Sequence, residues 1–186
     1  HDMMFLVEVM GRHCGDLAAY IAVAAGCELV AIPEYPTNVA ELVEKLKKFK
    51  QAQKRSIVMV VAEGDDIVKG HKDRHAADVL MEELKKAGSP YEMRSVILGH
   101  VMRGGTPAPG DRLLAVELGC EAVETLHEGA SGLMIGEIAG KIKRSPLGSV
   151  IVSREKCRDD VKKPVDAKEI LRMIDLVSVQ YDMRED

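Results

Sequence analysis

Apolar runs and amphipathic stretches alternate along most of the chain, which is the pattern of a fold built from alternating strands and helices. The run at 56–62 (SIVMVVA) is apolar at successive positions, as expected for a central parallel strand that is covered on both faces. Further strands are predicted at 4–9, 29–32, 93–98, 132–138 and 148–152. Helices are predicted at 17–25, 39–49, 74–87 and 111–128.

Capping signals mark the starts of two helices. Asn38 with Glu41 precedes the helix at 39–49, and Asp166 with Glu169 precedes a last helix. The apolar positions of that last helix are Ile170, Met173, Ile174 and Val177. Together the elements predict an α/β fold with a mostly parallel sheet and helices on both faces, a Rossmann-like three-layer arrangement. Neither a repeat nor a clear linker interrupts the chain, so residues 1–186 are predicted to form a single domain.

The composition narrows the function classes. Hydrophobic residues make up 46% of the 186 and charged residues 30%, and the net charge of −4 argues against nucleic acid or an anionic membrane as partner. No apolar run approaches the roughly 20 residues that span a bilayer, and residues 1–16 lack the pattern of a signal peptide. The four cysteines show no CxxC or zinc spacing, so we expect structural thiols in the reducing cytoplasm.

Several common signatures are missing from the sequence. It has no GxxxxGK[ST] loop, no GxGxxG fingerprint, no HExxH and no GxSxG. The usual nucleotide-binding loops, zinc proteases and α/β-hydrolases therefore have no support. The chain opens on His1 and not on methionine, so we expect it to begin inside a longer protein or after the remnant of a tag.

Three of the predicted strands are followed by residues suited to an anionic sugar. Met10-Gly11-Arg12 follows the first strand, Glu63-Gly64 follows 56–62, and GHVMRGG (99–105) follows 93–98. In parallel sheets, ligands bind beyond the carboxyl ends of the strands. Arginine and histidine donate to phosphate, glycines let the backbone approach an anion, and a carboxylate accepts hydrogen bonds from hydroxyls.

Each of these residues also has an ordinary structural interpretation. Arg103 would cap a turn, His100 would be a hydrogen-bonded core histidine, Glu63 would be a loop residue or a helix cap, and Arg12 would form a surface ion pair. From composition alone the structural interpretation is slightly favoured, because short motifs have many false positives. The convergence of three strand ends favours a site for an anionic, hydroxylated small molecule.

Two long segments carry a family resemblance. VEVMGRHCGDLA (7–18) resembles the segment of 6-phosphofructokinases that contacts fructose 6-phosphate. LGHVMRGGTPAPGDR (98–112) resembles their Leu-Gly-His-Ile-Gln-Arg-Gly-Gly-Ser-Pro segment with its following Asp-Arg, and VVAEG (60–64) lies between the two in the family's order. The similarity covers most of 4–140 and implies the C-terminal, fructose 6-phosphate-binding half of the phosphofructokinase fold.

The resemblance implies a role for each matching residue. Glu63 would accept hydrogen bonds from the sugar hydroxyls, and His100 and Arg103 would hold the 6-phosphate. Arg94 would reach across to the neighbouring subunit's site, and Arg12 would be catalytic, stabilising charge on the transferring phosphoryl group. The substrate-binding residues implied in this way are Met10, Gly11, Arg12, Glu63, Arg94, His100 and Arg103.

The resemblance also implies an effector site and shows two departures from the family pattern. The positions that match an effector site for a nucleoside diphosphate in bacterial allosteric members are Gly26, Glu28, Lys54 and Arg55. Met3 stands where the family normally has an arginine for the neighbour's sugar phosphate, and methionine cannot donate to phosphate. Met102 stands at a usual glutamine position.

In the family, the phosphoryl donor binds a preceding half, whose Gly-Thr-Ile-Asp-Asn-Asp segment supplies the general base. No such segment occurs here, so residues 1–186 are expected to be one sugar-phosphate-binding domain without its donor-binding half, inactive alone. The implied complete enzyme is a cytoplasmic, glycolytic, allosteric homo-oligomer, a dimer or tetramer, that uses Mg²⁺ and either ATP or pyrophosphate.

Other functions stay open at this point. The chain could be a stand-alone, non-catalytic subunit that binds a sugar phosphate or an effector, and the Met3 departure supports that alternative. A different parallel α/β phosphate-binding protein is harder to reconcile with two long motifs in family order.

Overall fold

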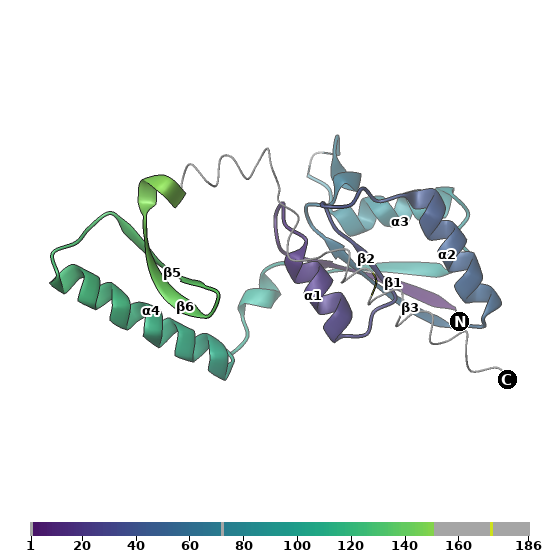
Figure 1. Ribbon diagram of the computed structural model, residues 1–186. Coiled ribbons are helices and arrows are strands. Elements are labelled where there is room, and N and C mark those ends of the chain that lie inside the picture. Colours follow the sequence, from purple (N-terminus) through teal and green to yellow (C-terminus); the bar gives the residue numbers. More distant parts are fainter. Residues whose placement is uncertain (1, 72, 151–171, 173–186) are drawn as a thin grey trace. The chain divides into compact units, whose positions relative to one another are not determined.

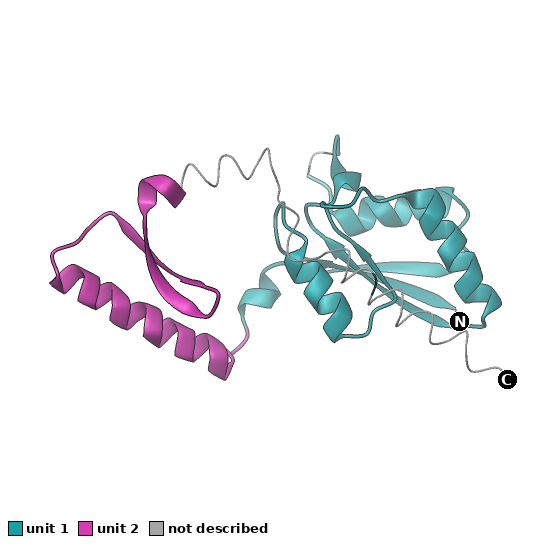
Figure 2. Ribbon diagram, in the orientation of Figure 1, with its two compact units in different colours: residues 1–104, 163–186 teal, residues 105–162 magenta. Residues whose placement is uncertain are grey.

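The computed structural model describes residues 2–71, 73–150 and 172. Contacts divide the chain into two compact units, drawn in different colours in Figure 2. The described part of the first unit is 2–71 and 73–104, with residue 172, and that of the second is 105–150. The prediction of a single sugar-phosphate-binding domain stays a prediction, and each unit is described by itself below.

The first unit is an alternating succession of strands and helices, labelled in Figure 1. Its strands are β1 (Met3–Val9), β2 (Leu29–Ala31), β3 (Ser56–Ala62) and β4 (Glu92–Ile97). Its α-helices are α1 (Asp16–Ala24), α2 (Val39–Gln51) and α3 (Ala76–Lys86). Two short 3₁₀ helices, η1 (Asp66–Val68) and η2 (Gly99–Arg103), follow β3 and β4.

The four strands form one parallel sheet in the order β2-β3-β1-β4. In this register Val7 of β1 lies opposite Val60 of β3 and Val96 of β4. Because all pairs are parallel, the carboxyl ends of β3, β1 and β4 are neighbours at one edge of the sheet. This arrangement confirms the predicted parallel sheet. It also brings together the three strand ends whose residues suit an anionic sugar.

Helices cover both faces of the sheet, as predicted (Figure 1). On one face, Leu46 of α2 and Leu80 of α3 pack with Leu6 of β1, and all three are fully buried. On the other face, α1 buries Ala18 and Ala22, whose small side chains let the helix lie close to the strands. The core is therefore a layer of aliphatic side chains on each side of β1 and β3.

The predicted cap of α2 is present. The side chain of Asn38 accepts hydrogen bonds from the backbone N–H groups of Ala40 at 3.1 Å and Glu41 at 3.3 Å. These bonds satisfy two of the N–H groups that a helix leaves without an intrahelical acceptor in its first turn. No helix within the described ranges is long and apolar enough to cross a bilayer.

The second unit pairs one helix with one hairpin. Helix α4 (Pro109–His127) begins where Asp111 accepts a hydrogen bond from the N–H of Ala108 at 3.0 Å. Strands β5 (Leu133–Ile138) and β6 (Lys141–Pro146) form an antiparallel pair. Arg144 of β6 pairs with Glu121 and Glu128, which ties the hairpin to the end of α4.

The strand predicted at 148–152 is wrong. Residues 147–150 are helical, and 151 and 152 lie outside the described residues. The strand that pairs with β5 is the more polar β6, joined to it by Ala139 and Gly140, which both have positive φ as a two-residue hairpin turn of type I′ requires. The predicted last helix lies outside the described residues except for residue 172.

The buried face of α2 gives a stability prediction. Leu46→Ala should lower the free energy of unfolding by about 2–5 kcal/mol, because it removes a fully buried side chain and leaves a cavity. Lys48→Ala, on the exposed side of the same helix, is the control and should change it by less than about 0.5 kcal/mol. Denaturant unfolding measures both, and equal effects would contradict the described packing of α2.

Candidate functional site

A carboxylate joins the ends of β1 and β3. Glu63 Oε1 accepts hydrogen bonds from the backbone N–H of Gly11 at 3.1 Å and of Arg12 at 2.7 Å. The N–H of Glu63 in turn donates to the carbonyl of Val9 at 3.0 Å. Both segments are therefore fixed to one another, and no hydrogen bond to Glu63 Oε2 is found within the described residues.

The two strand ends approach so closely that only glycine fits at position 64. A Cβ atom on Gly64 would lie 1.6 Å from the carbonyl oxygen of Arg12. Arg12 itself has φ +52°, a left-handed conformation that is uncommon for a residue with a side chain. Such local strain is kept where the surrounding contacts determine the backbone, here the bonds from Glu63 and the packing of Gly64.

The third strand end is tied to the same place. The N–H of Met10 lies 3.4 Å from the sulfur of Met102 in η2, and the N–H of Leu98 donates to the carbonyl of Glu8 at 3.1 Å. A 3₁₀ helix has three residues per turn, so His100 and Arg103 lie on the same side of η2. Both side chains are exposed.

Six of the seven predicted substrate residues thus gather at neighbouring strand ends: Met10, Gly11, Arg12, Glu63, His100 and Arg103. The interpretation of His100 as a core histidine is wrong, because its side chain is exposed. Within the described residues Arg12 forms no ion pair, so the interpretation as an ordinary surface pair gains no support there. Exposed cations beside a half-buried carboxylate can bind an anionic, hydroxylated ligand.

The seventh residue, Arg94, lies elsewhere. It is the third residue of β4 and is paired in register with Phe5 of β1, five residues before Met10. At about 3.3 Å per residue this places its backbone roughly 16 Å along the strand from the cluster. Its side chain is exposed on β4, an edge strand of the sheet. Within this unit Arg94 is therefore not part of the strand-end cluster.

The predicted effector residues lie at the amino ends of the strands, where β2 and β3 begin, and so at the other end of the sheet from the cluster. Lys54 Nζ pairs with Glu28 Oε1 at 2.8 Å, and Glu28 Oε2 accepts from the N–H of Val58 at 2.7 Å. Gly26 and Arg55 are exposed beside this pair. The structure therefore brings Glu28 and Lys54 into direct contact, and it keeps them apart from the strand-end cluster.

Sequence reasoning missed three carboxylates that tie neighbouring segments of the first unit together. Glu34 Oε1 accepts from the N–H of Gly15, which caps α1, at 2.7 Å, and so holds the far end of the loop that carries Arg12. Glu8 is buried in β1 and accepts from the N–H of Ala77 at 3.0 Å. The signal for Glu8 was visible, because it is a charged residue inside an otherwise apolar strand.

The third missed carboxylate is Asp65, which is fully buried. Its oxygens accept from the hydroxyl of Thr37 at 2.8 Å and the N–H of Ile67 at 3.0 Å. Burial raises the pKa of Asp65, since the charged form is separated from water. In the sequence, Asp65 stands in the polar, glycine-containing stretch GDDIVKGHKD (64–73), where nothing marks it as buried.

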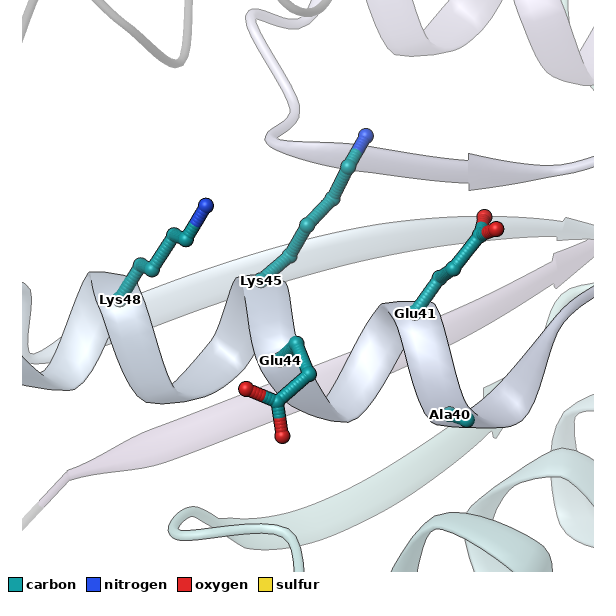
Figure 3. Close-up of a pocket in the computed structure, with 5 residues that line it drawn as sticks. All are labelled: Ala40, Glu41, Glu44, Lys45 and Lys48. Atoms are coloured by element: carbon teal, nitrogen blue, oxygen red, sulfur yellow. The ribbon is translucent and has the colours of Figure 1, made fainter.

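The linings of two surface pockets include none of the cluster residues. One, of about 400 Å³, lies along α2 and is lined by Ala40, Glu41, Glu44, Lys45 and Lys48 (Figure 3). Figure 3 shows the charged ends of Glu41 and Lys48 extending away from the helix, and both residues are exposed. The other, of about 160 Å³, lies between α2 and the end of β2. Within the described ranges no cluster of three or more His, Cys, Asp or Glu residues is placed to hold a metal ion.

The family model described as Phosphofructokinase matches residues 1–126 of the chain, which include the whole strand-end cluster. The chain belongs to the phosphofructokinase family. The resemblance predicted from the two long motifs is thereby confirmed.

Curated relatives agree with this assignment. The ATP-dependent 6-phosphofructokinase of Lactobacillus delbrueckii subsp. bulgaricus is 44% identical over 142 residues, which is 76% of this chain and 41% of the relative. ATP-dependent 6-phosphofructokinase 1 of Thermus thermophilus is 39% identical over 155 residues, 83% of this chain and 46% of the relative. The chain thus spans less than half the length of these relatives.

Solved structures show the same fold. Phosphofructokinase from Saccharomyces cerevisiae superposes with a TM-score of 0.72 and 30% identity, over 97% of this chain and 24% of the yeast chain. A pyrophosphate-dependent phosphofructokinase from Marinobacter aquaeolei gives a TM-score of 0.65 over 79% of this chain and 40% of that chain. At 22% identity, the latter shows the fold alone. The predicted phosphofructokinase fold is confirmed.

The close approach at Gly64 gives the second prediction. Gly64→Ala should lower the free energy of unfolding by roughly 1–3 kcal/mol, because the added Cβ collides with backbone and not with a flexible side chain. Gly105→Ala is the control, since a Cβ there meets nothing within 4 Å. Denaturant unfolding compares the two, and a Gly64→Ala protein as stable as the control would contradict the described contact.

Proposed function

We propose that this chain is the fructose 6-phosphate-binding part of a 6-phosphofructokinase, which transfers a phosphoryl group to the sugar's 1-hydroxyl in glycolysis. The observation that carries the proposal is the meeting of Arg12, Glu63, His100 and Arg103 at the carboxyl ends of β1, β3 and β4. Membership of the family and the order of its motifs support it.

The geometry supports a different role for each part of the site. His100 and Arg103, on one side of η2, would hold the 6-phosphate through charge-assisted hydrogen bonds. Glu63 uses Oε1 on backbone N–H groups and would offer Oε2 to sugar hydroxyls, beside Met10 and Gly11. Arg12, held in a fixed backbone conformation, would stabilise charge on the transferring phosphoryl group.

The donor and the general base would come from a part of the enzyme outside this sequence. The sequence has no Gly-Thr-Ile-Asp-Asn-Asp segment, which carries the base in the family. We propose ATP with Mg²⁺ as the donor and not pyrophosphate, because the curated relatives named above are ATP-dependent. We also propose that the complete enzyme is a cytoplasmic homo-oligomer. In it, Arg94, which is exposed on the edge strand of the sheet, serves a neighbouring subunit's site. A separate effector site would include Gly26, Glu28, Lys54 and Arg55.

The third prediction tests the phosphate site. Arg103→Ala should weaken fructose 6-phosphate binding roughly 10- to 150-fold, because a charge-assisted hydrogen bond contributes about 1.5–3 kcal/mol. Lys85→Ala removes the same charge from the exposed side of α3, at a residue outside both proposed sites, and should leave the affinity unchanged. Calorimetric titration measures both, and an unchanged affinity in Arg103→Ala would remove this residue from the site.

A second candidate function is a stand-alone, non-catalytic sugar-phosphate- or effector-binding subunit. Met3 favours it, because methionine at the family's arginine position removes a cation from the neighbour's phosphate site. The coding sequence upstream of His1 distinguishes the two: an in-frame Gly-Thr-Ile-Asp-Asn-Asp segment supports the enzyme, and a stop codon directly upstream supports the binding subunit.

The fourth prediction concerns activity. The isolated chain should not turn over fructose 6-phosphate with either ATP or pyrophosphate, because a positioned general base alone contributes about 10²- to 10⁴-fold to rate. A coupled assay on purified chain should stay at background with both donors. Turnover that persists through a second purification, at a constant specific activity, would refute the proposal that the chain needs another part.

A further inference from the structure

Asp65 is a buried carboxylic residue two positions after Glu63 of the candidate site. Its side chain is fully buried, and its oxygens accept hydrogen bonds from the Thr37 hydroxyl and from the N–H of Ile67. Thr37 belongs to the loop between β2 and α2, and Ile67 belongs to η1. The carboxylate therefore fixes the segment after β3 to a neighbouring loop.

The same residue closes the turn that contains Glu63. The N–H of Asp65 donates to the carbonyl of Ala62 at 3.0 Å, so Glu63 and Gly64 are the central residues of a tight turn. The backbone of Glu63 is thus held by two hydrogen bonds: its own N–H donates to the carbonyl of Val9 in β1, and the N–H of Asp65 closes the turn that contains it. A tight turn leaves little freedom for the direction of the Glu63 side chain.

We propose that Asp65 is a positioning residue for sugar recognition: it fixes the Ala62–Asp65 turn so that Glu63 keeps one oxygen on the N–H groups of Gly11 and Arg12 and presents the other to the ligand. The part that concerns the ligand rests on the proposed function. The part that concerns the order of the loop at Gly11 and Arg12 does not.

Stability alone does not account for a carboxylate at this position. The pKa of Asp65 in the folded protein lies above its value in an unfolded chain, so the native state binds the proton more tightly. The contribution of this group to the free energy of unfolding is therefore larger at acidic pH. It falls as the pH rises from the pKa of Asp65 in the unfolded chain to its pKa in the folded protein. Burial of this carboxyl group therefore works against stability as the pH rises, whereas its hydrogen bonds with Thr37 and Ile67 hold the turn.

Three variants separate the positioning role from a general effect on folding. Asp65→Ala removes both hydrogen bonds, and Thr37→Val removes one of them at a site outside the turn. Asp65→Asn is the matched control: its amide oxygen can accept from Ile67, and its NH₂ can donate to the Thr37 hydroxyl, which also accepts. Thermal unfolding of each variant establishes that it is folded before the other measurements are interpreted.

The first measurement needs no ligand. Amide hydrogen exchange, followed by NMR, should be roughly tenfold faster at Gly11 and Arg12 in Asp65→Ala and roughly threefold faster in Thr37→Val, while Leu6 in the middle of β1 stays unchanged. Asp65→Asn should exchange as the wild type does. Unchanged exchange at Gly11 and Arg12 in both Asp65→Ala and Thr37→Val would overturn the proposal.

The second measurement compares fructose 6-phosphate with inorganic phosphate by NMR titration. Asp65→Ala should bind the sugar phosphate roughly tenfold more weakly and inorganic phosphate equally well, because His100 and Arg103 lie on η2 and not on this turn. Equal losses for both ligands would indicate a general structural role and would overturn the proposal.

The two measurements also separate this proposal from the proposed function. A wild-type chain that does not bind fructose 6-phosphate refutes the proposed function, and the exchange measurement then still decides whether Asp65 orders the loop. If Asp65→Ala does not fold, Thr37→Val decides: wild-type exchange and affinity in that variant overturn the positioning role.

Discussion

The candidate site depends on a carboxylate that accepts two backbone hydrogen bonds across two strand ends. Glu63 Oε1 holds the N–H groups of Gly11 and Arg12, and this joins the residues after β3 to those after β1. The backbone of Arg12 keeps its left-handed conformation because Gly64, which has no Cβ, lies against its carbonyl oxygen. The direction of the Arg12 side chain is therefore a consequence of contacts made by residues more than fifty positions later in the chain.

This interaction works because β1 is central in the sheet. With β3 on one side and β4 on the other, the end of β1 is within reach of Glu63 and of η2. The parallel direction of all three strands places their polar ends at one edge and leaves the amino ends, with the Lys54–Glu28 pair, at the other. One sheet thus separates a cluster suited to a sugar phosphate from the residues that resemble an effector site.

Much of this could be predicted from the sequence, and the failures have physical causes. The strand at 56–62, the cap at Asn38 and the helix faces followed from periodicity, because burial of a sheet or helix face fixes which positions are apolar. The wrong strand at 148–152 came from apolar content. Four of the six residues of the observed β6 (KIKRSP) are polar, and what pairs it with β5 is a turn of two residues with positive φ.

The sequence by itself determined the family, the parallel α/β architecture of the first unit and the identity of the cluster residues, since these depend on local patterns and on two long motifs. Only the tertiary structure decided that six of the seven residues meet while Arg94 lies along the edge strand. It alone revealed Glu34 and Asp65 as carboxylates that tie neighbouring segments together. The physical reason is that a buried carboxylate is defined by its hydrogen-bond donors, and these donors come from segments that are distant in the sequence.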